Sequence, residues 1–381
     1  MKAIKKILKS CFVPISFLNK LVKKEKDRVF FYSNLGFRDN VRALYDYMIE
    51  NSLNGELKIT VATDDFKAFK ENAPENVRFV GLKRGIFSFL KAKYCFYSFG
   101  KYPIKPAQNQ CVVNLWHGMP LKGIGKLEKG GSREDQNFFT KIIATSPFFA
   151  DIMCRAFGAD SAQVLLTVQP RCDEFLKQTK KPEFLNGYDK VILWLPTFMS
   201  SKRLGRSDGG YTEISPFDPE LLQRLEPEFR DKNILLVIKP HPMDDVDPKI
   251  KGIKNILILK DSEMNISLHR LLKYSDALVT DFSSIYFDYM LLDRPIAFAC
   301  PDPEQYRKNR GFVVDDIAEL MPGYHINNVS DFLKFISDIA KGKDSFCEKR
   351  RECNRLCNSF DGISGCELIL KEIGLLKSEE N

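Results

Sequence analysis

The sequence predicts an α/β protein of two doubly wound domains that face each other across a cleft. The chain has 381 residues, which exceeds one ordinary core and suits two domains. Short apolar runs of strand length alternate with helical patterns in two series, which is typical of parallel sheets with helices on their faces. The polar stretch KQTKKPEFLNGYDK, which contains Pro182 and Gly187, separates the two series and is the candidate linker.

The first series predicts strands between which lie helical patterns such as DNVRALYDYMIEN and SPFFADIMCRAFG. These strands are Val29–Tyr32, Ile59–Ala62, Tyr94–Ser98, Val112–Leu115 and Ile142–Thr145. The second series predicts strands at Val191–Leu195, Leu235–Ile238, Ile256–Leu259, Ala277–Thr280 and Ile296–Ala299. The glycine-rich SKRLGRSDGGYTEIS predicts a mobile loop at the cleft. We therefore expect domains at 29–175 and 176–345, preceded by a basic segment at 1–28 and followed by a helical segment at 346–381.

Composition narrows the class of protein. The chain is 44% hydrophobic and 28% charged, as soluble globular proteins are, and no apolar run reaches the roughly 18 residues that span a bilayer. The 10 scattered cysteines, without a signal peptide, indicate reduced cytosolic thiols. The densest group, Cys347, Cys353, Cys357 and Cys366, lacks paired C-x-x-C spacing, which disfavours zinc. GxGxxG and Walker A motifs are absent, which disfavours nicotinamide chemistry and P-loop hydrolysis.

The net charge of +8 allows two interpretations. Nucleic-acid binding lacks support, because no aromatic-basic platform or recognition motif is present. At the N-terminus, MKAIKKILKSCFVPISFLNKLVKKEKDR alternates lysines with apolar residues, as segments on an anionic membrane surface do. An ordinary packing helix with solvated lysines fits the same pattern, and Pro14 is expected to kink or split any helix there.

Polar residues gather where predicted strands end, and in doubly wound sheets ligands bind beyond these carboxyl ends. His117 and Gly118 follow one strand in VVNLWHGMPLKGIG, and Thr197 follows another in VILWLPTF. Lys239 and His241 follow a third strand in LLVIKPHP. Two of the 4 histidines thus lie at strand ends, which favours a functional cleft; His269 and His325 lack such a setting and are interpreted as structural.

The stretch LVTDFSSIYFDYMLLDRPIAF places Asp281, Ser283 and Ser284 where a strand turns into a helix. One interpretation is a plain N-cap, and the other is an anion site made by the first-turn amides. Asp288 lies four residues after Ser284 and therefore faces the same side of the helix, where it can accept hydrogen bonds from hydroxyls.

The chemistry that these residues support is transfer of a phosphate group. Lys239 offers a fixed positive charge, His241 offers ring nitrogens, and the serines offer hydroxyls and helix amides for phosphate oxygens. With these groups a metal is not required, and no cofactor is predicted. His117 is the candidate base, because a positioned imidazole takes a proton from an alcohol near neutral pH. Gly118 leaves room for a substrate against the backbone.

Several motifs together resemble the CDP-glycerol glycerophosphotransferases, the teichoic acid polymerase family. The resemblance runs in order from about residue 29 to about residue 365. It rests on YSNLGFRDNVRALYDYM, LWHGMPLKGIG, KPHP, VTDFSSIYFDYMLLDRPIAF, DPEQYRKNRGF and SFDGISG. It implies a GT-B fold with an N-terminal Rossmann-like acceptor domain and a C-terminal Rossmann-like CDP-donor domain. It also implies transfer of glycerol phosphate from CDP-glycerol to a lipid-linked teichoic-acid-type or capsular acceptor, with release of CMP, at the cytoplasmic face of the bacterial membrane.

The resemblance also implies roles for single residues. His117 is the base, and His241 holds the pyrophosphate and stabilises the transferred phosphoryl group. Arg171, in QPRCDEFL, contacts the donor. The remaining expected CDP-glycerol ligands are Gly118, Thr197, Lys239, Ser283, Ser284, Asp288 and Arg310.

This sequence departs from the family pattern at Cys172, where asparagine is usual, and after Asp361-Gly362, where an arginine often follows. These departures concern the donor contacts and the transferred alcohol. The alternatives are therefore a CDP-ribitol ribitolphosphotransferase and a GT-B sugar-nucleotide glycosyltransferase or epimerase.

Overall fold

The computed structural model describes residues 2–129, 135–197, 200–201, 206–207, 214–241 and 246–377. The chain forms two compact units. Unit 1 comprises Met1–Met119, Arg133–Leu176 and Ser359–Asn381, and unit 2 comprises Pro120–Ser132 and Lys177–Asn358. This division differs from the expected boundaries in three places, of which the first is that residues 1–28 belong to unit 1. A short segment after His117 belongs to unit 2, and the C-terminal helical segment is shared between the units rather than separate.

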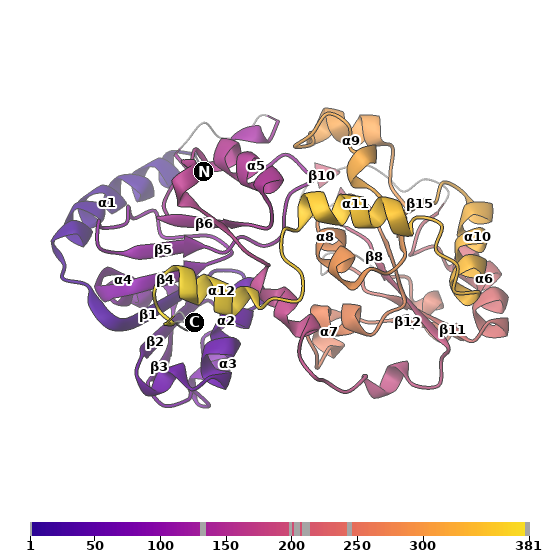
Figure 1. Ribbon diagram of the computed structural model, residues 1–381, viewed down its shortest axis with the longest axis horizontal. Coiled ribbons are helices and arrows are strands. Elements are labelled where there is room, and N and C mark those ends of the chain that lie inside the picture. The colour runs from indigo at the N-terminus through magenta and orange to yellow at the C-terminus, as the bar shows by residue number, and fades with distance from the viewer. Residues whose placement is uncertain are drawn as a thin grey trace. The chain divides into compact units, whose positions relative to one another are not determined.

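Unit 1 is built on a parallel seven-stranded sheet with the order β3-β2-β1-β4-β5-β6-β7 (Figure 1). This is the order of a doubly wound dinucleotide-binding sheet with one strand added. Its strands are β1 Glu25–Ser33, β2 Lys58–Thr63, β3 Val77–Val80, β4 Ala92–Tyr97, β5 Cys111–Asn114, β6 Lys141–Ala144 and β7 Val164–Leu166. Its helices are α1 Lys2–Leu21, α2 Asp39–Glu50, α3 Lys67–Lys70, α4 Leu82–Lys91, α5 Pro147–Phe157 and α12 Gly365–Glu372.

The predicted pattern SPFFADIMCRAFG shows why a helix of unit 1 starts and stops where it does. Ser146 is the N-cap of α5, and its hydroxyl accepts a hydrogen bond from the Phe149 amide. Pro147 takes the first helical position, where its missing N–H costs nothing. Gly158 ends the helix in the left-handed conformation, with φ of 65°.

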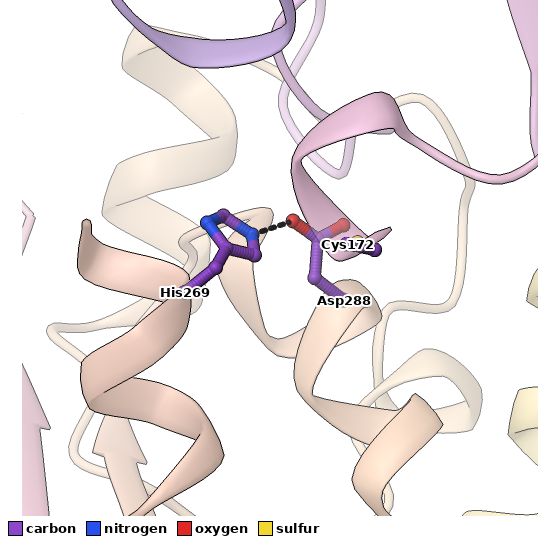
Figure 2. A group of neighbouring side chains, drawn as sticks. All are labelled: Cys172, His269 and Asp288. Carbon is purple, nitrogen blue, oxygen red and sulfur yellow. Dashed lines mark hydrogen bonds and ion pairs between the residues drawn. The ribbon is translucent and has the colours of Figure 1, made fainter. Parts of the chain in front are cut away.

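Unit 2 contains a parallel six-stranded sheet with the order β12-β11-β8-β13-β14-β15, which repeats the doubly wound arrangement. Its strands are β8 Lys190–Leu195, β11 Ile234–Ile238, β12 Ile256–Ile258, β13 Ala277–Thr280, β14 Ile296–Phe298 and β15 Tyr324–His325. Its helices are α6 Pro219–Asp231, α7 Leu268–Lys273, α8 Ile285–Tyr289, α9 Pro303–Asn309, α10 Val329–Ala340 and α11 Cys347–Cys357. Within this unit, His269 on α7 and Asp288 on α8 form a buried pair with a 2.9 Å distance from Nε2 to Oδ2 (Figure 2).

All ten predicted strands are present, and β3, β7 and β15 are additional. These three contain 4, 3 and 2 residues, and each lies at an edge of its sheet, where it pairs with a single neighbouring strand. The predicted mobile loop lies mostly outside the described residues. Of its residues 201–215, the structure describes Ser201, Arg206, Ser207, Ile214 and Ser215. Here β9 Ser200–Ser201 pairs antiparallel with β10 Arg206–Ser207.

The N-terminal segment forms one helix, α1, that continues through Pro14 instead of splitting there. Asn19 is fully buried, and its amide donates to the Lys105 carbonyl at 3.0 Å and to the Gln110 side chain at 2.9 Å. This contact anchors the end of α1 to unit 1. None of the helices in the described part of the chain is long and apolar enough to cross a membrane.

Candidate functional site

His117 lies just beyond β5, at the carboxyl edge of the unit 1 sheet, as the sequence predicts. Its ring is held between two aromatic side chains. The ring of Phe99 stacks on it at a centroid distance of 4.8 Å, and that of Trp116 lies at 4.1 Å. Because these rings displace water, they fix the imidazole plane and disfavour its charged form.

The protonation state of His117 follows from its hydrogen bond. Nδ1 lies 3.3 Å from the carbonyl oxygen of Ser98. Since a carbonyl only accepts, Nδ1 carries the proton in the neutral ring, and Nε2 keeps its lone pair. Burial lowers the pKa of His117, and the negative charge of Asp39 partly opposes this effect. The imidazole is therefore neutral at pH 7 and suited to accept a proton at Nε2.

The backbone around His117 takes conformations that side chains rarely adopt. Trp116 has φ of 48°, and Gly118 has φ of 121°. A Cβ at position 118 is disfavoured at that angle, so glycine is required there for conformation. The room for a substrate that is expected at Gly118 stays a prediction. Asn40, at the start of α2, supports the strained turn by donating to the carbonyls of Leu115 at 2.9 Å and Trp116 at 3.0 Å.

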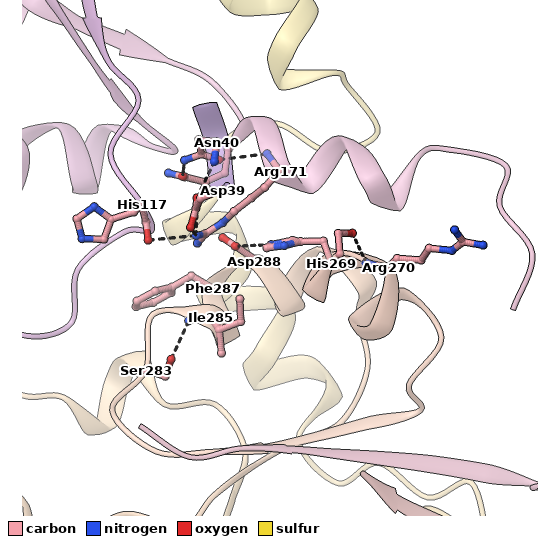
Figure 3. A network of polar contacts seen from close by, with 12 residues as sticks. Asp39, Asn40, His117, Arg171, His269, Arg270, Ser283, Ile285, Phe287 and Asp288 are labelled. Carbon is pink, nitrogen blue, oxygen red and sulfur yellow. Dashed lines mark hydrogen bonds and ion pairs between the residues drawn. The ribbon is translucent and has the colours of Figure 1, made fainter. Parts of the chain in front are cut away.

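Arg171 ties three segments of unit 1 together (Figure 3). Its Nη1 donates to both carboxylate oxygens of Asp39, at 3.0 and 2.9 Å, and to the carbonyl of His117 at 3.1 Å. Its backbone amide donates to the Asn40 side chain at 3.1 Å. The Arg171 side chain is 9% exposed. Arg171 thus holds the His117 loop, and its expected contact with the donor stays a prediction.

Asp173, two positions after Arg171, explains the role of SFDGISG, the last motif of the chain. The buried carboxylate of Asp173 accepts hydrogen bonds from the Ser364 hydroxyl at 2.6 Å and the Gly365 amide at 2.7 Å. Gly365 has no room for a side chain, because a Cβ there would lie 2.3 Å from the Val168 carbonyl oxygen. SFDGISG therefore attaches α12 to unit 1. The Asp173 pKa is raised by burial, which these hydrogen bonds partly offset.

In unit 2, Thr197 follows β8 and Asp281 follows β13, on the two sides of the point where the strand order reverses. Ligands of doubly wound sheets bind at this point. Asp281 is 1% exposed, and its Oδ2 accepts a hydrogen bond from the Thr197 amide at 2.7 Å. Burial raises the Asp281 pKa, and the charge of Lys122 partly offsets this. The carboxylate thus joins the two strand exits.

The serines that follow Asp281 differ from the expected caps. Ser284 occupies the N-cap position of α8, yet its side chain makes no capping hydrogen bond with the described residues. Ser283 Oγ accepts only a long bond of 3.4 Å from the Ile285 amide. Both hydroxyls are half-buried, and the Phe287 amide of the first turn donates to the Ser284 carbonyl at 3.2 Å. The anion site expected at this helix end stays a prediction.

The remaining candidate ligands of unit 2 already have partners. Asp288 is 3% exposed, and its carboxylate contacts His269. His269, which is interpreted as structural from the sequence, thus has a defined partner. Lys239 forms an ion pair of 2.6 Å with Asp261. His241 lies three residues after the end of β11, and residues 242–245, which follow it, lie outside the described residues. In another part of unit 2, Arg310 forms an ion pair of 2.7 Å with Glu128.

The sequence interpretation did not single out Asp39, Asn40, Ser98 and Phe99, although all four surround His117. Asp39 and Asn40 lie in the quoted motif YSNLGFRDNVRALYDYM, so this motif contained a signal. Asp39 also has φ of 63°, which is uncommon for a residue with a side chain. Ser98 contributes only its carbonyl, which no sequence pattern reveals.

Comparison with known proteins shows which family model and which relatives the chain resembles. Residues 15–373 match the family model described as CDP-Glycerol:Poly(glycerophosphate) glycerophosphotransferase. A teichoic acid glycerol-phosphate transferase of Staphylococcus aureus is 26% identical, covering 97% of this chain and 99% of that protein. A teichoic acid poly(ribitol-phosphate) polymerase of Bacillus spizizenii is 29% identical, but the match covers 64% of this chain and 43% of the polymerase.

A solved structure of the wall teichoic acid polymerase TagF, in a histidine-to-asparagine variant soaked with CDPG, has the same fold. Its TM-score is 0.72 at 21% identity, and the match covers 98% of this chain and 97% of that chain.

Proposed function

This chain belongs to the CDP-glycerol:poly(glycerophosphate) glycerophosphotransferase family, and from that premise we propose that His117 activates the hydroxyl of a lipid-linked, teichoic-acid-type acceptor. The enzyme is a glycerophosphotransferase. In the proposed step, Nε2 of His117 takes the hydroxyl proton while the acceptor oxygen forms a bond to the phosphorus of the glycerol phosphate. The bond from that phosphorus to the bridging oxygen breaks, and CMP leaves with this oxygen. The observation that carries the proposal is the contact of Nδ1 with the Ser98 carbonyl at 3.3 Å, which assigns the proton to Nδ1 and leaves the Nε2 lone pair to accept one.

We propose that the donor is held at the strand exits of unit 2. The half-buried serines and the first turn of α8 lie beside the point where the strand order reverses, and such helix ends attract phosphate. Thr197 and Lys239 are the proposed neighbours of the nucleotide. His241 is proposed to hold the pyrophosphate, and Asp288 and Arg310 to assist with glycerol and phosphate after rearrangement of their present pairs.

A substitution at Ser284 tests the donor site. We expect Ser284→Asp to raise the Kd for CDP-glycerol at least about tenfold, because a new carboxylate repels the pyrophosphate. Ser284→Asn is the matched control, since it has similar size but no charge. Isothermal titration with CDP-glycerol measures both variants. Equal affinity of the two variants for CDP-glycerol would place the pyrophosphate elsewhere.

The second candidate donor is CDP-ribitol, which the match to the ribitol-phosphate polymerase supports. Parallel titrations with CDP-glycerol, CDP-ribitol and UDP-sugars separate the candidate donors. Binding of CDP-glycerol alone supports the proposed function, whereas preference for CDP-ribitol replaces it. Preference for a UDP-sugar rules out the proposed function.

We propose that α1 holds the enzyme peripherally on the anionic inner face of the bacterial membrane, where a lipid-linked acceptor lies. Val13, Phe17 and Leu21 recur every four residues on one face of α1 and are 69%, 66% and 69% exposed. The lysines at 20 and 23 are exposed at the same end of the helix. An apolar face flanked by cations fits a surface of anionic lipid.

Replacing the exposed apolar face tests the membrane contact without removing the buried Asn19 anchor. The combined Val13→Ser, Phe17→Ser and Leu21→Ser variant is expected to lose at least about tenfold in affinity for phosphatidylglycerol vesicles, because burial of apolar side chains drives such binding. Turnover on a short soluble acceptor should stay near normal. Co-sedimentation provides the measurement, and Leu356→Ser, at a residue 47% exposed on α11, is the control. Unchanged sedimentation of the triple variant would return α1 to the role of a packing helix.

A further inference from the structure

Unit 1 contains a cavity of about 810 Å³ that nothing in the proposed reaction uses. It runs along the edge strand β3 and reaches the carboxyl ends of β2 and β3 at Thr63 and Val80. Its lining includes the apolar side chains of Phe66 and Leu82 and four cationic residues, namely Lys70, Arg78, Lys83 and Arg84. One end of the cavity, with Lys83 and Arg84, therefore lies on the same edge of the sheet as His117.

The charges of this lining are unbalanced. All four cations are exposed, and within the described ranges none of them forms an ion pair with a carboxylate. Asp64 is the one acidic residue among the described lining residues, and its Oδ1 accepts a hydrogen bond from the Gly36 amide at 2.8 Å. The cavity thus presents net positive charge to solvent and suits an anionic ligand.

The start of α4 adds to this positive field. Gly81 is the N-cap and provides no side-chain acceptor, and no acidic residue lies in the first turn. Lys83 and Arg84 are instead part of that turn, where the helix dipole disfavours cations. Two cations, free first-turn amides and the dipole therefore act together on one cavity. A bound anion offsets this repulsion, because its charge attracts both the cations and the positive end of the helix dipole.

We propose that this cavity binds phosphates of the acceptor chain that lie behind the reacting hydroxyl, an inference that rests on the proposed function. In the sheet order β2 lies three strands from β5 and β3 lies four, which corresponds to roughly 14–19 Å at the usual strand spacing. A glycerol-phosphate unit has six backbone bonds and spans about 7 Å, twice the reach of an amino acid residue. When the reacting end of the acceptor lies at His117, the phosphates about two to three units away from that end therefore reach the cavity.

Acceptor length provides the test. The enzyme is assayed with soluble glycerol-phosphate acceptors of a single unit and of about six units, since only the longer chain spans the estimated distance. For the combined Lys83→Gln and Arg84→Gln variant, we expect the KM of the long acceptor to rise about threefold to tenfold, the range for two exposed ion pairs. The KM of the single unit and the kcat should not change. Lys91→Gln, which removes a charge from the other end of α4 outside the cavity lining, is the control.

The outcomes separate the two proposals. Absence of transfer to either acceptor by the unmodified enzyme contradicts the proposed function. Direct titration of the long oligomer still tests the cavity in that case, and tighter binding to the unmodified protein than to the double variant supports it. Equal KM changes for both acceptor lengths, or none for the long one, overturn the inference. Loss of binding to phosphatidylglycerol vesicles without any change for the soluble oligomer also overturns it, because the ligand is then a lipid headgroup.

Discussion

His117→Ala is expected to bind CDP-glycerol with near-normal affinity but to transfer glycerol phosphate at least about 10²-fold more slowly, the loss expected for a missing general base. The structure gives the reason, because the Ser98 carbonyl fixes the proton on Nδ1 and leaves Nε2 as a base. Titration measures donor binding, and single-turnover kinetics measures the chemical step. His325→Ala, at an exposed residue on the edge strand β15, is the matched control. Near-normal turnover of His117→Ala would exclude the assigned role.

The pH dependence of the unmodified enzyme gives an independent check on the same residue. Burial lowers the pKa of His117 from its usual value near 6.5. The ring is therefore neutral above that value, and turnover declines only when the pH falls through the lowered pKa. We expect the acid limb of the kcat/KM profile to have its midpoint below about pH 6.5. An acid limb with a midpoint above this value, absent from the His117→Ala profile, would contradict the predicted burial effect.

The second large effect is expected at Asn40, which is fully buried and acts as a positioning residue for His117. Its side chain donates to the carbonyls of Leu115 and Trp116 and accepts from the Arg171 amide at 3.1 Å. Asn40→Ala leaves these groups buried without partners, which we expect to lower the free energy of unfolding by about 2–4 kcal/mol. Chemical denaturation measures this loss.

A purely structural role and a positioning role for Asn40 give different kinetics. If Asn40 positions the catalytic turn, kcat falls in the folded variant while the KM for CDP-glycerol stays near normal. Asn40→Asp keeps an acceptor for the Arg171 amide but loses the donors, so it should recover part of the stability and little of the kcat. Asn51→Ala is the control. Asn51 is exposed at the end of the same helix, and its side-chain amide donates to the Tyr47 carbonyl at 2.8 Å. A normal kcat for Asn40→Ala would leave Asn40 a role in stability alone.

The sequence by itself determined the two doubly wound sheets and the strand exits that contain the candidate site. The ten predicted strands are short, mainly apolar runs, and central strands such as β8 and β11 are buried along most of their length, as near-continuous apolar sequences indicate locally. The position of His117 followed from the same logic, because residues after a parallel strand lie at one known edge of the sheet. Family membership followed from motifs whose order along the chain needs no structure to detect.

Only the tertiary structure decided which groups contact these residues. Arg171 reaches Asp39 across 132 positions of sequence, and Asp173 reaches Gly365 across 192 positions. The proton on Nδ1 of His117 depends on a backbone carbonyl, which every residue has and no pattern marks. Ser284 does not take the expected capping role, because its backbone is already helical, with φ of −70° and ψ of −9°, whereas a capping residue usually has an extended backbone. Such contacts depend on packing between distant segments, whereas a local pattern reports only whether each segment is helical, extended or buried.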